Sequence, residues 1–221
     1  MTGRCLVLVG VFVTAAESGL GQAEGDDEWF ECSAGLGIDA FSAPTLTDYI
    51  NSVAQPRDAV EEFSTAVEFS VSPEFRVSGQ WSAGLEYSYL IKSYSVEGIG
   101  GGSRFTYGAH LPFVIVHYVI PWENSRLKLG GGGGMVLASF EEELFGGSTI
   151  RKYKARGGGA KLEAVANSRF DDHFFGLFAV DLRWVFGGVF RDGRSDASIG
   201  EVTADGDYFT VGLKFGVAFV W

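Results

Sequence analysis

The chain has 221 residues, with 17 Lys and Arg against 28 Asp and Glu, which gives a formal net charge of -11 at pH 7. This length fits one domain of ordinary size, and the acidic balance argues against nucleic acid as a partner, because its phosphates repel a surface of the same sign. No apolar run approaches the roughly 20 residues of a membrane-spanning helix, so the sequence excludes a helical membrane protein.

The first residues have the build of an export signal. An apolar stretch from Cys5 to Val13 follows a single arginine, and small residues come next, with cleavage expected after Ala23 or after Ala16. Such a stretch is too short to span a bilayer and is typical of a secretory signal peptide. We therefore predict a cleaved signal over residues 1–23 and one domain over residues 24–221.

Alternation of apolar and polar residues predicts β-strands along the rest of the chain. Seven segments show it in varying strength, and their predicted bounds are 28–40, 60–71, 75–89, 104–120, 127–139, 156–167 and 173–186. A tight turn is predicted at Ser72 to Glu74 and a bulge at Pro112. The fourth strand is predicted to turn Phe105 and Phe113 to the same outward face as its neighbours' apolar residues.

The eighth predicted strand, 208–221, is the clearest. Its odd positions from Phe209 to Trp221 are all apolar, while its even positions are mostly small or polar and include Lys214. One face suits lipid, and the other suits a crowded polar lumen. Aromatic residues near the strand ends are predicted to form interfacial girdles and are Trp29, Phe75, Trp122, Phe174, Tyr208, Phe219 and Trp221.

The connections between these eight strands alternate in length. Short ones are predicted near 72–74, 121–126 and 168–172, and long ones near 41–59, 92–103, 140–155 and 187–207. Short periplasmic turns and long external loops are expected of a closed antiparallel up-and-down transmembrane β-barrel, the all-β form that satisfies every backbone group in lipid. Both termini would lie on the periplasmic side.

The last strand also carries a specific motif. Lys214, Gly216, Phe219 and Trp221 follow the pattern polar, any, Gly, any, any, aromatic, any, aromatic. This resembles the terminal assembly signal of bacterial outer-membrane barrels, and the whole mature chain resembles the small eight-stranded barrels, the group that includes the OmpA membrane domain, OmpX and OmpW. The resemblance implies a place in the cell outer membrane, outer-membrane lipid as surroundings, and the barrel-assembly machinery as a partner during biogenesis.

The inward faces of the predicted strands carry charges of both signs. An eight-stranded barrel has a bore just wide enough for side chains, so these groups are expected to pair, because unpaired burial is costly. The predicted polar lumen network is Glu62, Gln80, Glu86, Lys161, Glu163, Asp181, Arg183 and Lys214. We favour a structural plug of salt bridges, and the alternative is a very narrow porin-like path for small solutes.

The first long connection is predicted to contain a short helix. Its apolar residues recur at helical spacing and are Leu46, Tyr49, Ile50 and Val53. Thr45 and Asp48 have the spacing of a capping box. The helix would cap the barrel mouth, lie at the membrane interface, dock a protein partner, or simply pack on the rim.

No catalytic residue, metal site or cofactor is predicted. His110, His117 and His173 fall on strands, whereas a lipid-modifying enzyme would need a histidine with a nearby Ser or acid at the rim or on the outer face. The run Gly130–Gly134 lacks the Lys-Ser/Thr of a phosphate loop and is interpreted as room for bulky lumen neighbours or for strand curvature.

Three functions are compatible with these sequence patterns. The leading one is a non-enzymatic outer-membrane barrel with a structural or interaction role or a very narrow pore, whose external loops form a recognition surface. The alternative is an outer-membrane lipid-modifying enzyme of acyltransferase or deacylase type. A soluble lipocalin-like barrel is disfavoured, because the aromatic face would overfill a small core.

Overall fold

The computed structural model describes residues 30–221 except 57, 62, 99–100, 145–148 and 194. The predicted signal peptide with its cleavage sites, Trp29 and Glu62 all lie outside the described residues. Among the described helices, none is long and apolar enough to cross a membrane.

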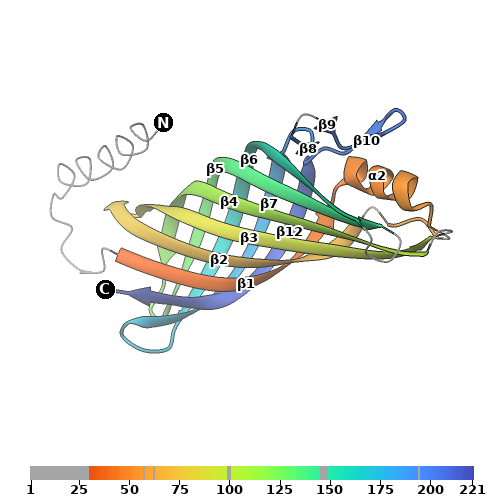
Figure 1. Cartoon of the computed structure of the whole chain (residues 1–221). Coiled ribbons are helices and arrows are strands. Elements are labelled where there is room, and N and C mark those ends of the chain that lie inside the picture. Colours follow the sequence, from red (N-terminus) through yellow and green to blue (C-terminus); the bar gives the residue numbers. More distant parts are fainter. Residues whose placement is uncertain (1–29, 57, 62, 99–100, 145–148, 194) are drawn as a thin grey trace.

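Eight long antiparallel strands form a closed ring (Figure 1). They are β1 (Phe30–Ser42), β2 (Phe63–Ser78), β3 (Trp81–Gly98), β4 (Gly101–Pro121), β5 (Ser125–Leu144), β6 (Thr149–Arg169), β7 (Phe174–Phe186) and β12 (Tyr208–Val220). Each pairs with the long strand before and after it, and the ring closes where β1 pairs with β12. The prediction of an all-β, up-and-down barrel of eight strands with a helix in the first connection is confirmed.

The remaining elements lie at one end of the ring (Figure 1). The helix α2 (Pro44–Ala54) stands between β1 and β2. The connection between β7 and β12 holds four short strands, β8 (Arg191–Asp192), β9 (Ser195–Asp196), β10 (Ser198–Ile199) and β11 (Val202–Thr203). The start of β1 and the end of β12 lie at the opposite end, which we call the terminal end.

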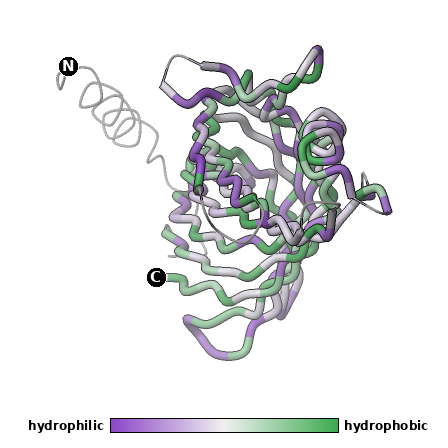
Figure 2. The backbone as a smooth tube through the Cα atoms, turned by 45° about the vertical axis from the view of Figure 1, so that its right-hand side comes forward, coloured by the Kyte–Doolittle hydropathy of each residue, from purple (hydrophilic) through white to green (hydrophobic). Residues whose placement is uncertain are grey.

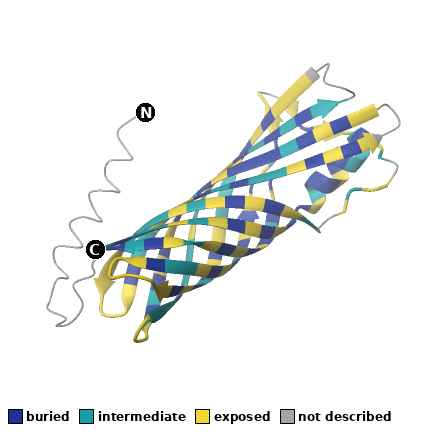
Figure 3. Ribbon diagram, turned by 90° about the horizontal axis from the view of Figure 1, so that it is seen from below, coloured by how far each residue is buried: buried dark blue, intermediate teal, exposed yellow. Residues whose placement is uncertain are grey.

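Side chains alternate between the two faces of the wall, as the pleat of a strand requires. On β12, Phe215 is 58% exposed and Lys214 only 3%. Buried and exposed residues alternate along the strands in Figure 3, and hydrophobic and hydrophilic residues do so in Figure 2. Large apolar side chains on the outside and charges within are the arrangement expected in lipid, and they are the reverse of a lipocalin-like barrel.

The predicted turn at Ser72–Glu74 is wrong. β2 continues through Pro73 to Ser78, and the turn consists of Gly79 and Gln80. Proline has no N–H to donate to a strand ladder. Pro73 is tolerated because the ladder between β2 and β3 is interrupted between Val71 and Glu74. Gly79 makes the reversal with φ of 49°, a conformation that glycine adopts at low cost.

β4 faces the opposite way from the prediction. Phe105 and Phe113 are buried inside the barrel, and His110 faces out. The predicted bulge at Pro112 is also wrong, because its pairing with Tyr87 of β3 continues in the same register on both sides. The prediction failed because both rows of β4 are largely apolar, so hydrophobicity does not distinguish its two faces.

Two of the four predicted long loops are strands instead. β3 and β4 pair as far as Gly98 and Gly101, and the β5–β6 ladder extends to Leu144 and Thr149. The predicted loops at 92–103 and 140–155 are therefore extended hairpins. The first and last long connections are confirmed, and they hold α2 and the four short strands.

Candidate functional site

Charged side chains fill the lumen toward the terminal end. Lys128 on β5 donates hydrogen bonds from Nζ to Glu31 Oε1 at 2.8 Å and to Glu74 Oε2 at 2.6 Å. All three side chains are buried. Asn167 Nδ2 also donates to Glu31 Oε1, at 3.2 Å. Each charge is thus met by an opposite charge from another strand, as burial requires.

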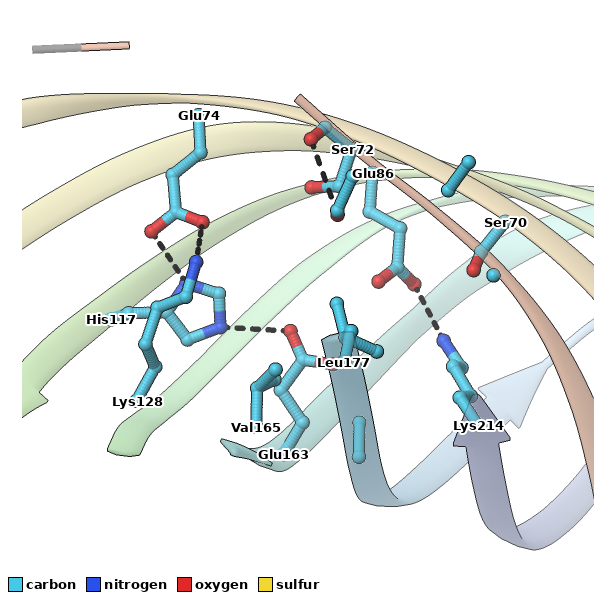
Figure 4. A pocket seen from close by; sticks show the side chains of 14 residues that line it. Ser70, Ser72, Glu74, Glu86, His117, Lys128, Glu163, Val165, Leu177 and Lys214 are labelled. Carbon is cyan, nitrogen blue, oxygen red and sulfur yellow. Dashed lines mark hydrogen bonds and ion pairs between the residues drawn. The ribbon is translucent and has the colours of Figure 1, made fainter. Parts of the chain in front are cut away.

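His117 joins this cluster to the middle of the lumen (Figure 4). Its Nδ1 lies 3.0 Å from Glu74 Oε1, and its Nε2 lies 2.9 Å from Glu163 Oε1. The neighbouring Gly130 leaves the space for this ring, because a Cβ at that position would collide with it. The glycine run thus makes room for a bulky lumen neighbour, as predicted.

The middle of the lumen holds a second group of ion pairs. Lys161 Nζ lies 2.6 Å from both Glu86 Oε2 and Glu163 Oε2. Lys214 Nζ lies 2.7 Å from Glu68 Oε1 and 3.3 Å from Glu86 Oε1. Because these contacts come from β2, β3, β6 and β12, they tie strands that are not neighbours in the ring.

Six of the eight predicted lumen residues lie in this network, and they are Glu86, Lys161, Glu163, Asp181, Arg183 and Lys214. Gln80 does not. It sits in the β2–β3 turn, exposed, and accepts a hydrogen bond from the Tyr118 hydroxyl. The misplaced turn at 72–74 caused this error. Glu62 lies outside the described residues.

Sequence reasoning missed several members of the network. They are Glu31, Glu68, Glu74, Ser82, Ser88, His117, Lys128 and Asn167, all buried. Glu31 and Glu68 stand on the polar rows of their strands, so the alternation of the sequence already contained a signal for them. His117 and Lys128 were hidden by the wrong face of β4 and by the glycine run of β5.

The other half of the lumen is apolar. Phe41, Tyr107 and Tyr208 pack with ring centroids 4.9 Å to 5.8 Å apart, and Phe140 lies 5.7 Å from Phe190. Tyr208 was predicted in the interfacial girdle, but it is buried inside because it belongs to the even, inward row of β12. This half therefore resembles the core of a soluble protein.

The predicted helix closes this apolar half. Leu46, Tyr49 and Ile50 of α2 are buried in the core, and Val53 packs against its edge. Tyr49 Oη donates to Glu142 Oε2 on β5 at 2.8 Å. Burial raises the pKa of Tyr49, and the hydrogen bond to Glu142 raises it further, so the phenol stays protonated and keeps donating.

The predicted capping box does not form. The N-cap is Ala43 without a side-chain hydrogen bond, and Pro44 occupies the first helical position, which suits proline. The Thr45 hydroxyl instead donates to the Asp205 carboxylate in the connection before β12. This bond ties the two connections together over the barrel mouth.

A cavity of about 30 Å³ remains between the two charged groups. Its lining includes Ser72, Glu86, His117 and Lys214 (Figure 4). A single water needs roughly 10–15 Å³ of such space, so the cavity has room for two or so. The arrangement can hold water between ion pairs.

The three histidines occupy three separate places. His117 is in the lumen, whereas His110 lies on the outer wall, with Nδ1 2.6 Å from Tyr87 Oη and its ring stacked on Tyr89. His173 Nδ1 lies 3.0 Å from the Val220 carbonyl oxygen at the terminal end. Within the described part of the chain, no group of three or more His, Cys, Asp or Glu is arranged to hold a metal ion.

The residues of the predicted assembly signal divide between the two faces of β12. Lys214 points into the ion-pair network. Phe219 and Trp221 lie outside with ring centroids 4.9 Å apart, and Trp221 contacts Phe30 of β1 at 4.4 Å. Gly216 allows close approach to β1, because a Cβ there would collide with the Ala34 carbonyl oxygen.

No family model and no curated protein sequence matches the chain. Its structure is similar to Neisserial surface protein A, with a TM-score of 0.52 and 11% sequence identity over 87% of this chain and 97% of that one. It is also similar to Ail of Yersinia pestis, solved with the heparin analogue sucrose octasulfate, with a TM-score of 0.50 and 8% identity over 89% of this chain and 100% of that one. The chain has the fold of small outer-membrane β-barrel proteins.

Proposed function

We propose that the chain is a non-enzymatic integral outer-membrane protein, a closed barrel that holds a recognition surface outside the cell. The apolar outer wall supports its place in lipid. The main support for a closed barrel is that side chains fill the lumen. Ion pairs fill it toward the terminal end, and an apolar core under α2 fills the other end. The outer-membrane assembly machinery would read the Lys214-to-Trp221 motif.

The end opposite the termini offers the recognition surface. The β3–β4 and β5–β6 hairpins are the longest elements, and α2 and the short strands stand beside them (Figure 1). Tyr49 and Thr45 fix the helix to β5 and to the last connection. A surface held by such bonds is preorganised, which lowers the entropic cost of binding a protein partner.

Membrane placement is tested by extraction and gel mobility. The protein should leave membranes only with detergent and should migrate differently on gels before and after heating, because a closed barrel resists the detergent when cold. Full solubility in buffer after removal of residues 1–23 would overturn the proposal.

Single-channel recording separates a closed barrel from a narrow pore. A solute would have to break several buried ion pairs to pass, so the wild-type protein should show no steady conductance in a planar bilayer. Steady conductance that changes in Lys214→Gln or Asp181→Asn would instead show that the lumen conducts.

Mass analysis of lipids from cells with and without the protein tests the enzyme alternative, and an altered acyl pattern would favour it.

A further inference from the structure

Three cations stand in a row on the outer wall of β6. Lys152, Lys154 and Arg156 occupy alternate positions and are exposed, so they point to the same side as Leu162 lower on the strand. Leu162 is part of the apolar outer wall. On β6 the row thus follows the apolar wall toward the end opposite the termini, where the proposed membrane placement would put lipid headgroups.

Two of these cations have no partner among the described residues. Lys152 Nζ pairs with Glu141 Oε1 at 2.7 Å. Lys154 and Arg156 make no side-chain ion pair or hydrogen bond with the described residues. Lys154 stands opposite Arg191 of β8, whose own charge is paired with Asp196 at 2.8 Å. In a chain with a net charge of -11, this local excess of positive charge is available to an anion.

Next to Arg156, toward the terminal end, the outer wall of β6 is apolar and its side chains are small. Gly158 and Ala160 are the next residues of the outward row of β6. Gly158 pairs with Met135 of β5 on one side and with Phe186 of β7 on the other. Met135 and Phe186 are 60% and 65% exposed. A strip of small residues between two large apolar side chains can receive an acyl chain directly beneath Lys154 and Arg156.

We propose that this face binds an anionic membrane lipid with a phosphate-bearing headgroup. The Lys154 ammonium and the Arg156 guanidinium would hold the phosphate, for which the planar guanidinium can supply two parallel N–H donors. One acyl chain would lie over Gly158 and Ala160, between Met135 and Phe186. The proposal rests on the membrane placement given under the proposed function.

Native mass spectrometry of the folded, full-length mature chain tests this site. The protein is released from nanodiscs of phosphatidylcholine that contain phosphatidic acid, and the lipid retained is identified. Wild type should retain phosphatidic acid over phosphatidylcholine. A cation at a membrane surface contributes roughly fivefold to binding, so Lys154→Gln with Arg156→Gln should weaken retention by roughly thirtyfold.

Two matched variants control for charge and folding. Arg104→Gln removes an exposed cation from the outward row of β4 and should retain the lipid. Lys154→Arg with Arg156→Lys keeps both charges and should also retain it. The heat-dependent gel shift verifies that each variant is folded.

The outcomes separate the two proposals. If wild type enters nanodiscs and shows the gel shift but does not prefer phosphatidic acid, or if Arg104→Gln loses the lipid as strongly as the double variant, the lipid site is refuted and the membrane barrel stands. If wild type does not enter nanodiscs, the membrane placement itself falls, and the lipid site falls with it.

Discussion

Arg183 and Glu68 form a doubly hydrogen-bonded ion pair inside the barrel. Nη1 donates to Oε2 at 2.7 Å and Nη2 to Oε1 at 3.1 Å, and neither residue has any exposed surface. The pair links β7 to β2, which are separated in the ring by β1 and β12. Its geometry therefore ties together strands that share no backbone hydrogen bonds.

Removal of both partners should cost less than the sum of the costs of removing each one alone. Arg183→Met removes the cation that donates two hydrogen bonds to the buried Glu68 carboxylate. We expect the free energy of unfolding to fall by about 3–5 kcal/mol. Adding Glu68→Leu should give a double variant that is more stable than the sum of the single losses, by about 0.5–3 kcal/mol. Urea unfolding in lipid vesicles measures both, and strict additivity would show that the pair is not coupled.

The bond between Tyr49 and Glu142 should hold α2 in the barrel mouth. Tyr49→Phe leaves the buried Glu142 without this donor, which should reduce the local stability of α2 by about 1–3 kcal/mol. Hydrogen exchange of the α2 amides measures the effect. Ser52→Ala, on the helix surface, is the control and should leave exchange unchanged.

The stability that the Tyr49–Glu142 hydrogen bond gives to α2 should fall at high pH. Because the pKa of Tyr49 is higher in the folded than in the unfolded chain, its contribution is complete below the ordinary tyrosine pKa of about 10 and declines as the pH rises above it. Wild-type α2 should thus exchange faster in strongly alkaline buffer, after correction for intrinsic rates, by more than the Tyr49→Phe helix does.

The inward glycines of β5 should not tolerate a methyl group. A Cβ at Gly132 would collide with the backbone carbonyl of Val114 on β4, whereas a Cβ at Gly158 would meet only an ordinary contact at 3.5 Å. Gly132→Ala should cost about 1–3 kcal/mol in unfolding free energy, and Gly158→Ala much less. Equal losses in the two variants would contradict the close packing of β4 on β5.

Depth in the membrane should govern the cost of a charge on the outer wall. Phe215 lies at the middle of the outward row of β12, and Phe209 near its far end. Phe215→Arg should cost about 2–4 kcal/mol in a bilayer, and Phe209→Arg about 0–1 kcal/mol. Unfolding from vesicles measures both, and the reverse order would place the lipid elsewhere.

The aromatic terminus should matter for assembly in cells. Trp221→Ala should reduce the amount of heat-shifting protein in the outer membrane several-fold, whereas Trp221→Phe should preserve it, because an aromatic ring is kept at the end of the motif. Val217→Ala, in the same outward row, controls for lost apolar contact. If Val217→Ala lowers assembly as much as Trp221→Ala, the motif has no special role.

The fold was predictable where the two rows of a strand differ in character. On β12, Lys214 and the small residues face one way and Phe215 and its neighbours the other, so alternation revealed the faces. On β4, the inward row is apolar because it fills the apolar half of the lumen, and the outward row is largely apolar too. Hydrophobicity therefore did not distinguish the two faces of this strand. Pro73 led to the wrong turn because proline usually ends a strand. Here β2 continues through it, because the ladder between β2 and β3 is interrupted at this position.

The lumen charges were predictable as a set, but their partners were not. Lys128 and Glu31 are 97 residues apart, and Lys214 and Glu86 are 128 apart. Which strands face each other depends on how the ring closes and on the register of every ladder, and alternation within one strand contains no such information. The helix α2 was predictable from its spacing, whereas its bonds to Glu142 and Asp205 depend on distant connections.

Closure of the ring joins the first and the last of the eight long strands. β1 pairs with β12 along twelve residues, and Phe30 and Trp221 exchange backbone hydrogen bonds at the rim. During synthesis β1 therefore waits for the last strand, and until then two strand edges have unpaired N–H and C=O groups. Because hydrocarbon offers such edges no partner, a barrel in lipid would need β12 paired with β1, and we expect a chain that lacks β12 to have no stable state there.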